Sequence, residues 1–199
     1  MRNKAGILIV AGFLLGSGNA CGHLINSGFG PFYDGLAHPF LVADDLLPVI
    51  ALTLLAGLRG VRCGRAVAFA LPLAWLAGMV AARMVLLPSE PLWMTGALTI
   101  LFGALVAADR PLPVAVVAGL ASVAGAAHGF GNGRELSTVN GGLLAMAGIV
   151  CALFVVTSII SGQVAALRSH RTRVVVRVAG SWIAAIGLLM LGWALRAHQ

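Results

Sequence analysis

Long apolar runs separated by short polar turns dominate this sequence. Six runs occupy residues 39–58, 66–86, 91–108, 112–131, 139–161 and 176–195. Each is close to the 20 or so residues that a helix needs to cross the hydrocarbon core of a bilayer. Backbone polar groups in lipid must be satisfied within the chain, so each run is expected to be a helix. The pattern predicts an all-α, polytopic bundle of six transmembrane helices. Because the turns are short, we also expect consecutive helices to pack as antiparallel neighbours in one compact bundle.

The region before these runs has a different character. Arg2 and Lys4 precede an apolar stretch at 5–15, and the small residues Gly18 and Ala20 follow. This order is typical of a secretory signal peptide, so we expect cleavage after Ala20; an uncleaved first helix is the alternative. Residues 21–38 are rich in glycine, proline and aromatics and are predicted to form an exposed or partly re-entrant segment rather than an ordinary helix. Residues 21–199 would then form a single transmembrane domain.

Composition supports the membrane interpretation and excludes several functions. The chain is 60% hydrophobic and 10% charged, whereas soluble domains have about 25% charged residues. The net charge is +7, and most of the basic residues lie in short loops. This distribution favours a role of these residues in orienting the protein in the membrane over nucleic-acid binding. The three cysteines form no CxxC pair, and no nucleophile–base pair or phosphate loop is present. We therefore do not expect an enzyme.

Arginine clusters predict the orientation. One loop holds Arg59, Arg62 and Arg65, and another holds Arg168, Arg171, Arg173 and Arg177. Basic loops stay in the cytoplasm, so both are expected there. Alternation then places residues 21–38, 87–90 and 132–138 outside, together with the C-terminus. Arg83 and Arg196, near outer ends, depart mildly from this rule.

A first set of ionisable residues lies where the first span begins. His38, Asp44 and Asp45 lie near the predicted outer end of that span. Pro39 suggests that the helix starts at residue 39, with His38 at its entrance. The seven-residue spacing of His38 and Asp45 would then place both on one face. Imidazole and carboxylate together suit divalent metals such as nickel, cobalt, zinc and copper. Stabilisation of the helix N-terminus is the alternative role for the two aspartates.

A second group follows at the predicted outer end of the fourth span, where His128 and Glu135 are also seven residues apart. Gly129, Gly131 and Gly133 between them predict that the helix breaks here. A glycine-rich break at membrane depth is tolerated where it lines a cavity; a simple helix end is the alternative. The arginine-based topology places both groups on the same side of the membrane.

A third candidate depends on the cleavage site. Cleavage after Ala20 would leave a mature chain beginning Cys21-Gly22-His23. A free amine with histidine at the third position can bind copper or nickel in square-planar geometry. Otherwise His23 is a polar residue in an exposed segment.

Two stretches resemble motifs of the HupE/UreJ family. "GFGPFYDGLAHPFLVADDLLPVIALTLLAGLRG" is similar to the family's first motif, roughly HPxxGxDH before an apolar helix. "HGFGNGRE" at 128–135 is similar to the second, roughly HGxxHGxE. The six-span layout behind a signal peptide also fits, so the resemblance covers nearly the whole chain. It implies a membrane permease for nickel or cobalt that is associated with hydrogenase and urease maturation.

The match to the motifs is incomplete. His38, Pro39 and Asp44 match the first motif, but Asp45 stands where a histidine is expected. In the second motif the residues that match are His128, Gly129, Gly133 and Glu135, and Asn132 replaces the other histidine. Oxygen ligands thus replace two of four imidazoles, and nickel favours nitrogen. Asp45 can still bind a metal, and Asn132 weakly.

These observations predict a secondary permease in the bacterial inner membrane, with the mature N- and C-termini periplasmic. A divalent ion, nickel or cobalt first and copper or zinc second, would be the transported substrate. Its expected ligands are His38, Asp44, Asp45, His128, Asn132 and Glu135, with His23 as a further candidate. A non-transporting accessory protein, with metalloenzyme maturation proteins as partners, is the alternative. The spans contain few polar residues below the outer groups, which favours that alternative.

Overall fold

The chain folds into helices throughout the part that can be described. The computed structural model describes residues 27–85 and 92–197, so the predicted signal peptide and His23 lie outside the described residues. The described elements are α2 (Pro31–Leu41), α3 (Ala43–Leu58), α4 (Val61–Met84), α5 (Leu92–Ala108), α6 (Val114–Leu136), α7 (Gly142–Ala165) and α8 (His170–Ala197). No strand occurs among them. The prediction of an all-α polytopic bundle is confirmed.

Most of these helices have the length and composition of membrane spans. The helices α4, α6, α7 and α8 are each long and apolar enough to cross a membrane. The helices α2 and α3 reach that length only together, as a pair bent by 72°. The apolar α5 is shorter, with 17 residues, which at 1.5 Å per residue extend over about 25 Å. A helix of this length lies at the lower end of the range for crossing a bilayer.

The beginning of the first span differs from the prediction. The helix does not start at residue 39, because α2 already begins at Pro31, a residue whose fixed φ suits the first helical position. The predicted non-helical segment is therefore wrong for residues 31–38. The chain instead breaks at Val42, which is extended with φ −101° and ψ 101°. Packing of α2 against α7 outweighs the local glycine and proline content, since Gly35 lies directly against the backbone of Ala145.

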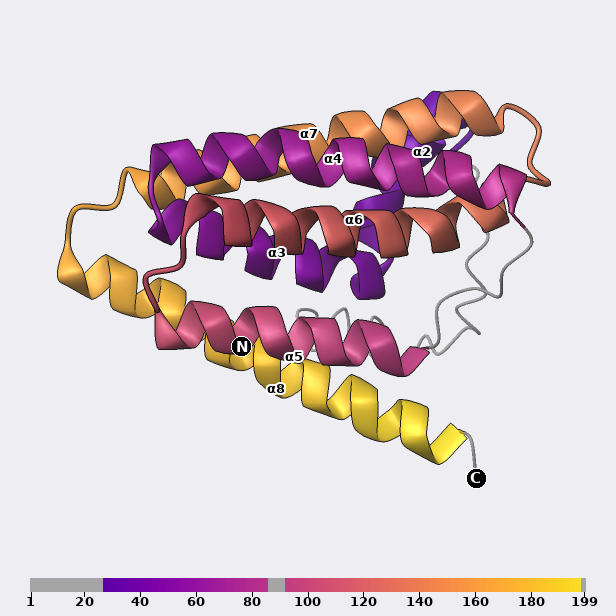
Figure 1. Cartoon of the computed structure of the whole chain (residues 1–199). Coiled ribbons are helices and arrows are strands. Elements are labelled where there is room, and N and C mark those ends of the chain that lie inside the picture. The colour runs from indigo at the N-terminus through magenta and orange to yellow at the C-terminus, as the bar shows by residue number, and fades with distance from the viewer. Residues whose placement is uncertain (1–26, 86–91, 198–199) are drawn as a thin grey trace, which may run out of the picture.

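Consecutive helices are not the main packing partners, contrary to the expectation from the short turns. The closest pairs are α4 with α6, α5 with α8 and α2 with α7, while α4 also packs on α7 (Figure 1). The helix α3 contacts every other described helix, and residues 51–58 within it are all buried. A helix that is apolar on all sides is best placed at the centre of a bundle. The outer helices therefore pack around α3 and not simply in chain order.

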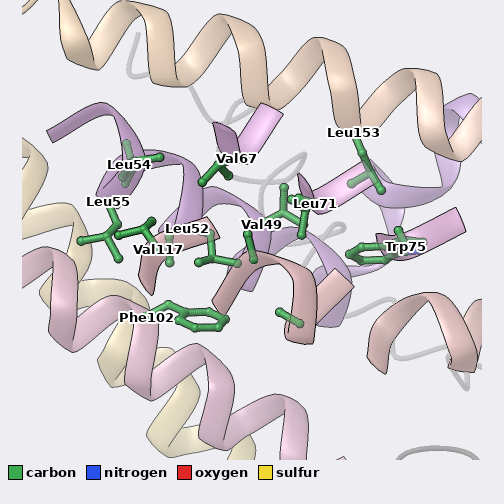
Figure 2. Packing of buried hydrophobic residues seen from close by; sticks show 14 of the residues in the cluster. Val49, Leu52, Leu54, Leu55, Val67, Leu71, Trp75, Phe102, Val117 and Leu153 are labelled. Carbon is green, nitrogen blue, oxygen red and sulfur yellow. The ribbon is translucent and has the colours of Figure 1, made fainter. Parts of the chain in front are cut away.

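Side chains of α3 form the middle of the hydrophobic core. Figure 2 shows Val49, Leu52 and Leu55 of α3 among side chains from four other helices. The contributions from those helices include Val67 and Leu71 of α4, Phe102 of α5, Val117 of α6 and Leu153 of α7. All of these side chains are buried.

Glycines set the distance between α4 and α6. The predicted break at Gly129, Gly131 and Gly133 is wrong, because α6 is continuous to Leu136. Gly125, Gly129 and Gly133 recur every four residues and face α4; a Cβ at Gly129 would overlap the carbonyl oxygen of Trp75. Such spacing of small residues permits close approach of membrane helices. The glycines thus serve packing between helices and do not interrupt α6.

Among the described turns, those between α3 and α4, α5 and α6, and α7 and α8 lie at one end of the bundle, and that between α6 and α7 lies at the other, as the sequence predicts (Figure 1). At the arginine-rich end the carboxylate of Asp109 pairs with Arg59 and, at 3.4 Å, with Arg173. Arg173 also donates to the carbonyl of Leu58, and Arg177 Nε donates to the carbonyl of Ala107 at 2.9 Å. These contacts join the C-terminal ends of α3 and α5 to the N-terminal part of α8.

Candidate metal-binding site

A buried carboxylate at the end opposite to the arginines is the centre of the candidate site. Asp45, in the first turn of α3, is 3% exposed. Its Oδ1 lies 3.1 Å from His128 Nδ1, and its Oδ2 accepts a hydrogen bond of 3.0 Å from Asn132 Nδ2. His38 Nε2 lies 3.4 Å from Oδ2. Three helices thus converge on one carboxyl group, and the two groups of ionisable residues predicted from the sequence meet in space.

The break at Val42 brings His38 to Asp45. In a continuous helix, residues seven apart are separated by about 10 Å along the axis. The expectation that His38 and Asp45 share one face of a single helix is therefore wrong, because His38 lies in the last turn of α2 and Asp45 in the first turn of α3. The 72° bend between the helices folds one turn toward the other. His38 is 6% exposed, so the pair is shielded from solvent.

The continuous helix α6 supplies the other two partners. His128 and Asn132 are four residues apart, which places them on the same face of a helix. They are 1% and 8% exposed. The amide oxygen of Asn132 accepts a hydrogen bond of 3.3 Å from Trp75 Nε1 on α4. With its nitrogen donating to Asp45 and its oxygen accepting from Trp75, the orientation of the Asn132 amide is fixed.

Trp75 belongs to the site and was not predicted from the sequence. Its ring stacks on His128 with 5.4 Å between centroids and 17° between planes. The side chain is fully buried, so it packs in the core and is not an interface anchor. Its position in the chain could have indicated a buried role, because it lies in the middle of α4, whereas interface tryptophans lie near the ends of spans.

Two further predicted ligands, Asp44 and Glu135, make no hydrogen bond to the Asp45 carboxylate. Asp44 is half-buried in the same turn as Asp45. Glu135 is exposed, one residue before the end of α6. His23 is outside the described residues. The structure therefore brings together His38, Asp45, His128 and Asn132, with Trp75 behind them.

The cluster has the donor types of a metal site in a closed arrangement. A neutral His128 that donates from Nδ1 to Asp45 keeps its lone pair on Nε2, the arrangement in which a carboxylate orients a metal-binding imidazole. Yet no group of three or more His, Cys, Asp or Glu side chains in the described ranges is arranged to hold a metal ion. Ring nitrogens of both histidines face the Asp45 carboxylate and not a common centre.

Comparison with known proteins identifies the family. No curated protein and no solved structure matches the chain. The family model described as HupE / UreJ protein matches residues 11–190, which include both motifs and every described helix up to most of α8. The chain therefore belongs to the HupE/UreJ family.

Proposed function

We propose that this membrane protein is a secondary permease that takes up a divalent transition metal ion from the side on which Asp45 lies. The observation that supports this proposal most is the convergence of His38, Asp45, His128 and Asn132 from three helices. Membrane-embedded ionisable residues are rare and usually functional. The family's association with nickel and cobalt uptake points to the same class of substrate.

The chemistry of the cluster suits such an ion. Stripping water from a divalent ion is costly, so several ligands must replace the lost hydration. Asp45 offers two oxygens, and His38 and His128 each offer an imidazole nitrogen. For a metal to bind, these groups must turn from one another toward the ion, so binding and rearrangement of the cluster are coupled. We expect nickel or cobalt as the substrate, with copper and zinc as competitors for the same donors.

The interior beyond the cluster is closed in this conformation. Val49, Leu52 and Leu55 of α3 occupy it. The buried hydroxyl groups of Thr53 and Thr157 are bonded to their own helices, at the carbonyls of Val49 and Leu153, both at 2.6 Å. Release to the other side would therefore require the helices around α3 to separate.

This closure favours a second candidate function. A non-transporting accessory protein of metalloenzyme maturation would need no path through the bundle. Its cluster would serve the fold by satisfying a buried carboxylate. The two functions differ in one observable, the net entry of metal into cells.

The test is metal accumulation in cells that express the chain, measured separately for nickel, cobalt, copper and zinc. The variants His38→Ala, Asp45→Asn and His128→Ala are expected to lose uptake of the preferred metal at least about tenfold, because each removes a ligand or the group that orients it. The matched control is His170→Ala, an exposed histidine at the start of α8, which is expected to leave uptake unchanged. Asp44→Ala and Glu135→Ala show whether those carboxylates contribute.

Quantification of each variant in the membrane fraction separates loss of uptake from loss of protein. If the wild type accumulates none of the four metals although it is present in the membrane, the permease proposal fails and the accessory role stands ahead.

A further inference from the structure

A cleft between α4 and α7 lies near the arginine-rich end, far from the cluster around Asp45. Its volume is about 390 Å³. The residues around it come from the first half of α4 and the second half of α7: Val61, Gly64, Arg65, Ala68, Phe69, Phe154, Ser158, Ser161 and Gly162. At one wall of the cleft α4 and α7 approach closely, since a Cβ at Gly64 would lie 2.9 Å from the hydroxyl oxygen of Ser161.

Polar groups of this cleft have no partner within the described part of the chain. Ser161 is 3% exposed, yet its hydroxyl makes no hydrogen bond there, unlike the hydroxyls of Thr157 and Thr53. Arg65 likewise forms no ion pair, although Arg59 and Arg173 are both engaged by Asp109. A nearly buried hydroxyl and an uncommitted guanidinium in one hollow indicate a ligand with acceptor oxygens and negative charge.

The polarity of the cleft changes with depth. At 1.5 Å per residue, Arg65 lies about 6 Å inside the beginning of α4, and Ser161 about 6 Å inside the end of α7. Phe69 and Phe154 lie deeper, roughly 12–16 Å from those ends. Their rings are 5.4 Å apart. A ligand that fills this cleft must therefore be polar and anionic at its outer end and apolar at its inner end.

We propose that this cleft binds one anionic phospholipid from the leaflet at the arginine-rich end. The phosphate would contact Arg65 and the hydroxyls of Ser158 and Ser161, and an acyl chain would lie along Phe69 and Phe154. The N-terminus of α4 adds a partial positive charge beside Val61. Basic pockets between transmembrane helices are known to bind such headgroups. A soluble anion would leave the apolar half of the cleft unfilled, and a metal cation would be repelled by Arg65.

The test uses the full chain in a mild detergent and counts retained lipids by native mass spectrometry. Phosphatidylglycerol and phosphatidylcholine of equal chain length are the probes, and no metal is added. The wild type is expected to retain one phosphatidylglycerol in preference to phosphatidylcholine. Arg65→Gln is expected to weaken retention about fivefold, the effect of one arginine near an anionic headgroup. Arg62→Gln is the control, since Arg62 is exposed on the same helix but does not line the cleft.

A second variant fills the cleft without disturbing the packing. A Cβ at Gly162 would meet no atom within 4 Å, so Gly162→Leu is expected to fold normally and to obstruct the outer, headgroup end of the cleft. Gly119→Leu on α6 is its matched control, because that position is equally open. Loss of the bound lipid in Gly162→Leu and Arg65→Gln, with retention in both controls, supports the site. Equal retention of the two lipids by the wild type, or no difference between variants and controls, overturns it.

Discussion

At the scale of single residues, Asp45 decides the character of the site. A carboxylate that is 3% exposed is costly to bury unless hydrogen bonds compensate for lost water. Asn132 and His128 supply those contacts from α6, and His38 approaches from α2. The same groups are metal ligands by chemistry, so the pairing that stabilises the closed cluster must be given up when an ion binds.

The sequence identified these four residues, but not the tryptophan that holds them. Residue type and position near span ends were enough to single out His38, Asp45 and His128. The contact of Trp75 with Asn132 depends on which helices are neighbours, and a single chain without its fold does not reveal that.

Replacing Trp75 by phenylalanine should destabilise the protein by about 1–3 kcal/mol, because the buried amide oxygen of Asn132 loses its donor. The expected result is a lower unfolding temperature in detergent, with reduced metal uptake as the Asn132 amide loses its fixed orientation. Trp182→Phe is the control, since Trp182 is 69% exposed. If both variants unfold at the wild-type temperature, the hydrogen bond from Trp75 does not hold the site.

At the scale of elements, helix continuity differs from the local sequence signals in both α6 and the first span. In α6, the sequence predicts a break at Gly129, Gly131 and Gly133, yet the helix is continuous, and Gly125, Gly129 and Gly133 form a stripe that packs closely on α4. In the first span the sequence favoured one helix, yet Val42 divides it into α2 and α3. Local propensity is a weak guide in both cases because contacts between helices outweigh it.

Gly129→Ala tests this packing directly. The new Cβ would overlap the Trp75 carbonyl, so α6 must shift, at a cost of about 1–3 kcal/mol. Gly119→Ala, on the same helix at an open position, should be neutral or slightly stabilising because alanine favours the helix more than glycine does. Unfolding midpoints in detergent compare the two. Equal midpoints would mean that α6 does not depend on the glycine stripe.

At the scale of the whole molecule, the two ends of the bundle differ in their charged residues. The end with Arg59, Arg173 and Asp109 is held by ion pairs, and the opposite end holds the cluster around Asp45. Turns alternate between the two ends when each span crosses the membrane once, and the described turns do so (Figure 1). The sequence also predicts which end faces the cytoplasm, through the arginine-rich loops.

Labelling of single cysteines in intact cells checks this orientation. In a background without the native cysteines, Asn140→Cys should react with a membrane-impermeant maleimide, because the turn between α6 and α7 is predicted to be periplasmic. Ser169→Cys, between α7 and α8, should react only after the membrane is opened. Both positions are exposed, so they are matched in accessibility. The reverse pattern would invert the topology and place the Asp45 cluster at the cytoplasmic face.

The sequence by itself determined the helical membrane fold and the alternation of its turns, and it singled out polar residues near one end of the spans; that His38, Asp45, His128 and Asn132 meet was decided by the tertiary structure. The features that the sequence determined follow from the length of the apolar runs and from the free-energy cost of burying charge, and both depend only on short stretches of the sequence. Only the tertiary structure decided that α3 lies at the centre, that α6 is continuous, that the first span bends at Val42 and that Trp75 joins the site. The physical reason is that these features depend on which helix faces meet, and small residues such as Gly129 acquire their role only from the helix packed against them.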